Sequence, residues 1–149
     1  MFCQCEVEGK SPVVFLTSSH YRTESVPGPV TPAQYGEFGH VVSLRREERH
    51  VCDGSLISPT AILTTATCCL AGLTVARLGD YYTDSTDLYE QDLAVGQTIV
   101  HEAYDDWTIQ NDICMVRLEQ PADTSSQFVA TIPLPSDDTD YLPGQTCQE

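Results

Sequence analysis

The chain has 149 residues, of which 22 are acidic and 7 are Lys or Arg, so its formal net charge is −15. A surface of that sign repels phosphate backbones and anionic lipid headgroups, which argues against nucleic acids and membranes as partners. The length allows one domain with a modest core. No apolar stretch is long enough to span a bilayer.

The cysteine content indicates the compartment. Seven cysteines in a chain of this size are typical of an oxidising environment, so we expect an extracellular, secreted protein. No signal peptide is visible, because the apolar run at residues 13–16 is too short and lacks a basic flank. We therefore expect either a start further upstream or a fragment. Because seven is odd, at least one thiol is free or pairs between chains.

Residues 1–32 are expected to form an irregular N-terminal arm or linker, because four prolines interrupt them and no periodicity persists. The remainder, residues 33–149, is expected to form one domain of short strands separated by turn or charge clusters. The expected strands are 40–44, 54–58, 61–66, 73–78, 93–100, 112–118 and 128–134. Many short strands and no long amphipathic helix predict an all-β antiparallel barrel or sandwich.

Three stretches carry a family resemblance. Residues 52–57 read C-D-G-S-L-I, residues 63–68 read L-T-T-A-T-C, and residues 111–113 read N-D-I. The corresponding stretches of trypsin-like serine proteases read C-G-G-S-L-I, L-T-A-A-H-C and N-D-I. Further matches follow in order at residues 35–44, 50–52, 101–104 and 143–147.

Over about residues 33–149 the chain thus resembles the N-terminal half of a trypsin/chymotrypsin-like (peptidase family S1) serine protease. The resemblance implies a single antiparallel six-stranded Greek-key barrel, the first barrel of the chymotrypsin fold. It also implies a site, because Asp112 aligns with the acid of the catalytic triad and Thr67 stands where the family has its catalytic His.

The triad needs a serine oxygen that attacks, an imidazole that takes its proton, and a carboxylate that orients the imidazole. A threonine hydroxyl has no useful basicity near neutral pH, so Thr67 cannot act as the general base. The half of the family that carries the serine is not found in this sequence. The four histidines fall at arm or structural positions, namely 20, 40, 50 and 101.

Asp112 begins an expected strand in which Cys114, Val116 and Leu118 share its face. An acid at the head of an apolar face is either an end-of-strand residue or a buried acid with a partner. The resemblance favours the second interpretation.

The resemblance also implies a disulfide between Cys52 and Cys68, which lie sixteen residues apart around an expected hairpin. The alternative is a pair of free buried thiols. Cys114 is expected to be a small buried hydrophobe, with a bridge to Cys69 as the alternative. The pairing of the remaining cysteines, residues 3, 5 and 147, stays open.

The loop at residues 80–90 aligns with a calcium loop of some family members, in which Asp80, Asp87 and Glu90 would supply carboxylate ligands. The competing interpretation is chance placement among 22 acidic residues. No other cofactor is expected.

Together these features predict a secreted trypsin-like serine endopeptidase family member that is catalytically inactive and acts by protein binding or regulation. Its expected partner is an extracellular protein, either an active protease or a substrate of one. The alternative is the truncated record of an active serine endopeptidase that cleaves peptide bonds by a Ser/His/Asp mechanism. A third alternative is a gene product without function.

Overall fold

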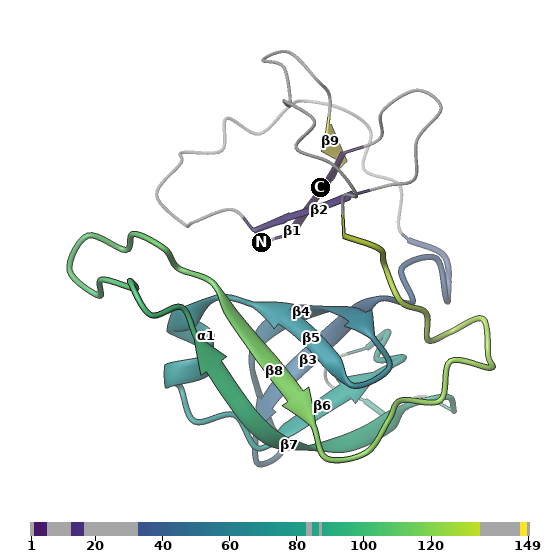
Figure 1. Ribbon diagram of the computed structural model, residues 1–149. Coiled ribbons are helices and arrows are strands. Elements are labelled where there is room, and N and C mark those ends of the chain that lie inside the picture. Colours follow the sequence, from purple (N-terminus) through teal and green to yellow (C-terminus); the bar gives the residue numbers. More distant parts are fainter. Residues whose placement is uncertain are drawn as a thin grey trace.

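A computed structural model describes residues 33–82, 85, 86 and 88–134, together with the backbone of residues 2–5, 13–16 and 147–148. Six strands close into a barrel, in the order β3-β4-β5-β8-β7-β6, and every neighbouring pair is antiparallel (Figure 1). The strands are β3 (Val41–Arg46), β4 (Arg49–Ser58), β5 (Ala61–Thr64), β6 (Val75–Leu78), β7 (Gln91–Val100) and β8 (Cys114–Leu118). The predicted six-stranded antiparallel barrel is confirmed.

Alternation along the strands builds the core. In β8, Cys114, Val116 and Leu118 are buried, whereas Met115 and Arg117 point to solvent, because successive side chains leave a strand on opposite faces. The buried cluster draws apolar side chains from five of the six strands. It includes Val42, Leu44, Leu56, Ile62, Ala76, Leu78, Cys114, Val116 and Val129.

A glycine lets two of the strands approach closely. A Cβ atom added to Gly54 in β4 would lie 2.5 Å from Cγ2 of Ile62 in β5, which is closer than packed carbons tolerate. The glycine of the C-D-G-S-L-I stretch is therefore a packing requirement of the barrel.

The expected strand at residues 128–134 is wrong. The Ala130 N–H donates to the Gly39 carbonyl at 2.9 Å, and the Ile132 N–H donates to the Leu56 carbonyl at 2.9 Å. The segment thus passes from the turn before β3 to β4 and forms no ladder with either, while Pro133 has no N–H to donate. Its apolar residues are explained by burial, because Val129 and Ile132 lie in the core region.

The structure also places strands within the expected arm. β1 (Phe2–Cys5) pairs with β2 (Val13–Leu16) and with β9 (Cys147–Gln148), giving a separate three-stranded sheet in the order β2-β1-β9. The apolar run of β2 has the composition of a strand, but four residues are too few to reveal a period.

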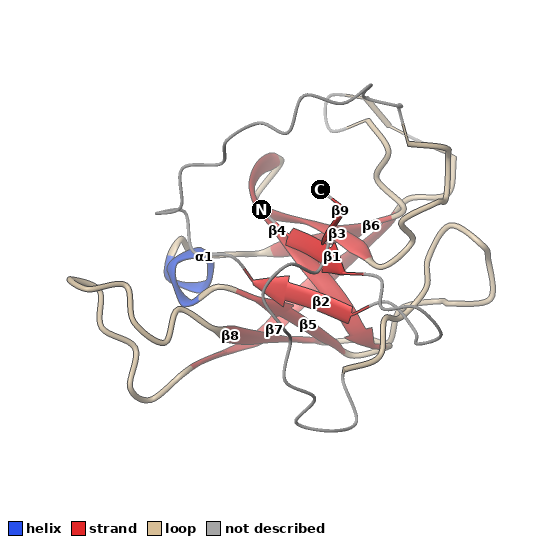
Figure 2. Cartoon of the chain, turned by 90° about the horizontal axis from the view of Figure 1, so that it is seen from above, coloured by secondary structure: helices blue, strands red, loops and turns tan. Residues whose placement is uncertain are grey.

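One short helix, α1 (Ala66–Leu70), follows β5 and lies beside β7 and β8 at one end of the barrel (Figure 2). Thr65 caps its first turn, since the Thr65 hydroxyl oxygen accepts the Cys68 N–H at 3.1 Å. Within the described ranges, no helix has the length and apolar character needed to cross a membrane.

Candidate functional site

The structure brings together the two residues that the sequence resemblance assigns to the catalytic triad. Thr67 is the second residue of α1, and Asp112 precedes β8 by two residues. The Thr67 N–H donates to Oδ1 of Asp112 at 2.8 Å. The Thr67 hydroxyl lies 3.1 Å from Oδ1 and 3.1 Å from Oδ2. Thr67 therefore forms hydrogen bonds with both carboxylate oxygens of Asp112.

Tyr104 extends this pair. Its hydroxyl lies 3.1 Å from Oγ1 of Thr67. Because the single Thr67 proton is donated to Asp112, the tyrosine hydroxyl donates to Thr67. Sequence reasoning did not identify Tyr104 as a site residue. The available signal was the match at residues 101–104, whose last residue is this tyrosine.

The loop before β8 fixes the acid. Asn111 has φ of 56°, in the left-handed region that asparagine tolerates better than most residues. Its side-chain amide donates to the Ala103 carbonyl at 2.8 Å. The Ile113 N–H donates to the Asn111 carbonyl at 2.8 Å, and Ile113 in turn accepts from the His101 N–H at 3.1 Å. Asp112 has the partner that the favoured interpretation expects, but it is half-buried rather than buried.

Two disulfides hold the same region. Cys52 of β4 is joined to Cys68 of α1, with the Cα atoms 5.9 Å apart. Cys69 of α1 is joined to Cys114 of β8, with the Cα atoms 6.5 Å apart. The expectation that Cys114 is an unpaired buried hydrophobe is wrong, because the alternative, its bridge to Cys69, forms. The two bridges tie α1, the helix that carries Thr67, both to β4 and to β8.

No histidine in the described part of the chain forms a hydrogen bond or ion pair with Asp112. The ring of His50 lies 2.8 Å from the Ser43 hydroxyl, and His101 accepts the Ala103 N–H at 3.1 Å. Burial lowers the pKa of His40, which keeps that ring neutral. His20 lies outside the described residues. The site as built is a Tyr–Thr–Asp hydrogen-bonded chain that contains no imidazole.

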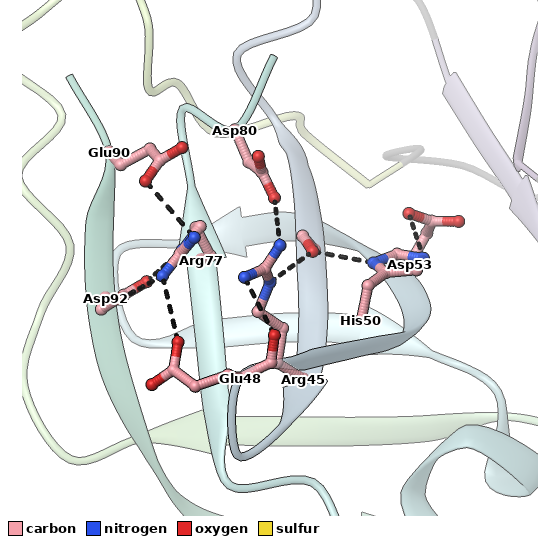
Figure 3. Close-up of polar contacts among 9 residues, drawn as sticks. Arg45, Glu48, His50, Asp53, Arg77, Asp80, Glu90 and Asp92 are labelled. Carbon is pink, nitrogen blue, oxygen red and sulfur yellow. Dashed lines mark hydrogen bonds and ion pairs between the residues drawn. The ribbon is translucent and has the colours of Figure 1, made fainter. Parts of the chain in front are cut away.

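Two of the three predicted calcium ligands face arginines (Figure 3). Oδ2 of Asp80 lies 3.5 Å from Nη2 of Arg45, and the two side chains are 2% and 4% exposed. Oε2 of Glu90 lies 3.5 Å from Nη1 of Arg77. Asp87 lies outside the described residues, and among those described no three metal-ligating side chains come together. The calcium site stays a prediction.

Arg77 is the centre of a surface network in the same view. Its Nε donates to Oδ1 of Asp92 at 2.6 Å, and its Nη2 donates to Oδ2 at 2.7 Å (Figure 3). This paired geometry is the strongest form of an arginine–carboxylate contact, and it lowers the pKa of Asp92. The network joins the facing residues of β6 and β7.

Comparison with known proteins identifies a family. A family model described as Trypsin matches residues 29–149. Trypsin V-A of Rattus norvegicus is 41% identical over 86 residues, which cover 58% of this chain and 34% of the relative. Trypsin I-P1 of Gallus gallus is 36% identical over 98 residues, which cover 66% of this chain and 38% of the relative. Trypsin of Xenopus laevis is 35% identical over 124 residues, which cover 83% of this chain and 49% of the relative. The matched region spans between about a third and half the length of these relatives.

Proposed function

The chain belongs to the trypsin family of serine proteases, and we propose that it is a catalytically inactive homologue that acts by binding other proteins. The observation that carries the proposal is the contact between Thr67 and Asp112. The hydroxyl and the N–H of Thr67 both bond to the carboxylate, where a triad requires an imidazole.

The chemistry of the hydroxyl supports inactivity. Triad catalysis needs a group that accepts the serine proton during attack and returns it to the leaving amine. A threonine hydroxyl does neither near neutral pH, since it is far too weak a base. In subtilisin, the loss of the histidine base alone lowers kcat by about 10⁶-fold. We expect a loss of that order from threonine at this position.

An extracellular location and a protein partner complete the proposal. The two disulfides beside the site support an oxidising compartment. A protein that keeps the barrel of a protease but lacks its catalytic base can still bind other proteins through the surface of that barrel. The proposed partner is an active protease or one of its substrates.

Two measurements test the proposal. The protein in its natural length is first assayed for hydrolysis of arginyl and lysyl peptide p-nitroanilides, beside its Asp112→Asn variant. We expect both proteins to release no product above the buffer rate. Hydrolysis that falls by about 10⁴-fold in the variant, as loss of the triad acid produces in trypsin-like enzymes, would show a working triad and refute inactivity.

The second measurement concerns binding. The protein is immobilised, and active trypsin or a trypsin substrate protein is passed over it. Saturable binding that alters the kcat/KM of trypsin toward that substrate is the expected result. If neither trypsin nor its substrate binds, the proposed role toward such partners is wrong.

A further inference from the structure

The first and last strands of the chain, β1 and β9, lie side by side in the three-stranded sheet (Figure 1). They pair in antiparallel register, so that Gln4 lies opposite Gln148 and Cys5 lies opposite Cys147. Two of the cysteines whose pairing the sequence leaves open are therefore direct cross-strand partners. Neither the proposed function nor the triad positions assign a role to this sheet.

Only three cysteines are available for a further bridge. The two disulfides beside Thr67 use four of the seven cysteines of the chain. Those that remain are Cys3, Cys5 and Cys147, and all of them belong to β1 or β9. One bridge among them leaves a single thiol, as an odd number of cysteines requires.

The backbone register brings Cys5 and Cys147 within the range of a disulfide. Directly opposed residues of an antiparallel pair have Cα atoms about 4.5–5.5 Å apart, and they share one face of the sheet. Disulfides join residues whose Cα atoms are about 4.4–6.8 Å apart. A bridge between these two cysteines therefore requires no change in the pairing of the strands.

The two other pairings fit less well. Cys3 lies two residues before Cys5 in β1 and is therefore diagonal to Cys147. Diagonal Cα atoms are about 7–8 Å apart, which is beyond the roughly 7 Å at which a bridge requires the backbone to move. Within β1, Cys3 and Cys5 are two strand residues apart, or about 6.6–6.8 Å, at the upper end of the range.

The shortness of β9 gives the bridge a structural role. This strand has two residues, fewer than the roughly 3–10 of ordinary strands, so backbone pairing alone holds it weakly. One of the two residues is Cys147, the residue opposite Cys5. A covalent bond at this position would keep β9 beside β1, which the short ladder does poorly.

We propose that Cys5 and Cys147 form a third disulfide, which ties the N-terminal arm to the segment after the barrel and leaves Cys3 as the one thiol. The oxidant is a disulfide such as glutathione disulfide. The Cys5 thiolate attacks it and releases one glutathione, and the Cys147 thiolate then displaces the second. Two electrons pass to the oxidant, and the two cysteine protons end on the two glutathione thiols. The inference does not depend on whether the protein is catalytically inactive.

The test is a disulfide map of the full chain, folded in a glutathione redox buffer and blocked with N-ethylmaleimide. Trypsin cuts after Lys10 and Arg117, which places the two arm cysteines in fragment 1–10 and Cys147 in fragment 118–149. In the monomer band of a non-reducing gel, we expect one mass that joins the two fragments and carries one maleimide. Reduction should separate them. Fragments found only apart, joined to other fragments, or joined only in a dimer band would overturn the proposal.

Variants assign the bond within fragment 1–10. Cys3→Ser should keep the joined mass and lose its maleimide, whereas Cys5→Ser should lose the joined mass. The opposite pattern, or equal yields from the two variants, would show that the register does not select the pair and would refute the proposal. The Cys69–Cys114 bridge joins fragments 50–77 and 78–117, and that mass shows for each variant that the barrel has formed.

Discussion

The hydroxyl of Thr67 lies 3.1 Å from each carboxylate oxygen of Asp112, and the N–H of the same residue donates to Oδ1 at 2.8 Å. One short side chain therefore takes up the acid, which in the family holds the imidazole. The acid keeps its hydrogen bonds, so the local fold survives without the base.

Replacing Thr67 by valine tests the contact. Valine keeps the shape and the N–H but removes the hydroxyl, which also leaves the Tyr104 hydroxyl without its acceptor. We expect a loss of about 0.5–1.5 kcal/mol in the free energy of unfolding by urea. Thr67→Ser keeps the hydroxyl and serves as the control. If serine and valine cost the same, the hydroxyl makes no net contribution.

The left-handed backbone of Asn111 gives a second prediction. Asn111→Gly and Asn111→Ala both lose the hydrogen bond to the Ala103 carbonyl, but only alanine is strained at φ of 56°. Alanine should therefore be less stable than glycine by about 1 kcal/mol in denaturant unfolding. Equal stabilities would show that this loop relaxes when the side chain changes.

The two disulfides should contribute different amounts to the free energy of unfolding. The Cys69–Cys114 bridge encloses 45 residues and the Cys52–Cys68 bridge encloses 16. In the chain-entropy model, removal of the first bridge by paired Cys→Ala changes costs about 4 kcal/mol, and removal of the second costs about 3 kcal/mol. Urea unfolding of the two double variants gives the order, and the reverse order would contradict the entropic explanation.

The Arg77–Asp92 pair predicts a pH effect. The hydrogen bond from Arg77 lowers the pKa of Asp92 below 3.8, so the folded state binds this proton less readily than the unfolded state does. The stability that the pair contributes is fully present above the pKa of Asp92 in the unfolded state. It is lost as the pH falls through the lowered pKa of Asp92 in the folded state. Asp92 is half-exposed, so the effect is small.

Unfolding of the native chain and of Asp92→Asn is compared between neutral pH and about pH 2, below the ordinary carboxyl range. The difference in stability that favours the native chain should shrink at the acid end. A difference that stays constant with pH would show that the pair does not perturb the titration of Asp92.

The ion pairs of Asp80 and Glu90 favour chance placement of these acids over a calcium site, so calcium should have little effect on the melting temperature. Asp80 and Glu90 face the guanidinium groups of Arg45 and Arg77, and these cations already offset the charge that a metal would neutralise. Tm is measured in a chelator and then in millimolar CaCl₂. A saturable rise in Tm that Glu90→Gln removes would establish the calcium loop instead.

Most of the strands could be predicted because their information is local, whereas the six-stranded barrel, rather than a sandwich, was implied by the family resemblance. In β8, the alternation of side chains that the sequence predicts matches the alternating burial in the structure. Short apolar runs separated by Gly and Pro mark the other strands. The strand predicted at 128–134 was wrong because the apolar residues of this segment are buried without a ladder, and composition alone does not distinguish the two cases.

Site features that depend on distant contacts were harder to predict. Thr67 and Asp112 were paired through the family motifs, but the contribution of Tyr104 needed the loop geometry. The bridge between Cys69 and Cys114 joins residues 45 apart, and no spacing rule selects it from seven cysteines. The register that places Cys5 opposite Cys147 likewise joins strands at opposite ends of the sequence, which spacing does not pair.

The most direct test of the central claim is labelling by a fluorophosphonate probe, which reacts with a serine activated by its triad. The protein in its natural length is incubated with the probe beside active trypsin at equal concentration. With Thr67 on Asp112 and no imidazole between them, we predict that trypsin is labelled and this protein is not. Labelling of the native protein that Asp112→Asn abolishes would contradict the claim, because a base other than Thr67 would then be at work.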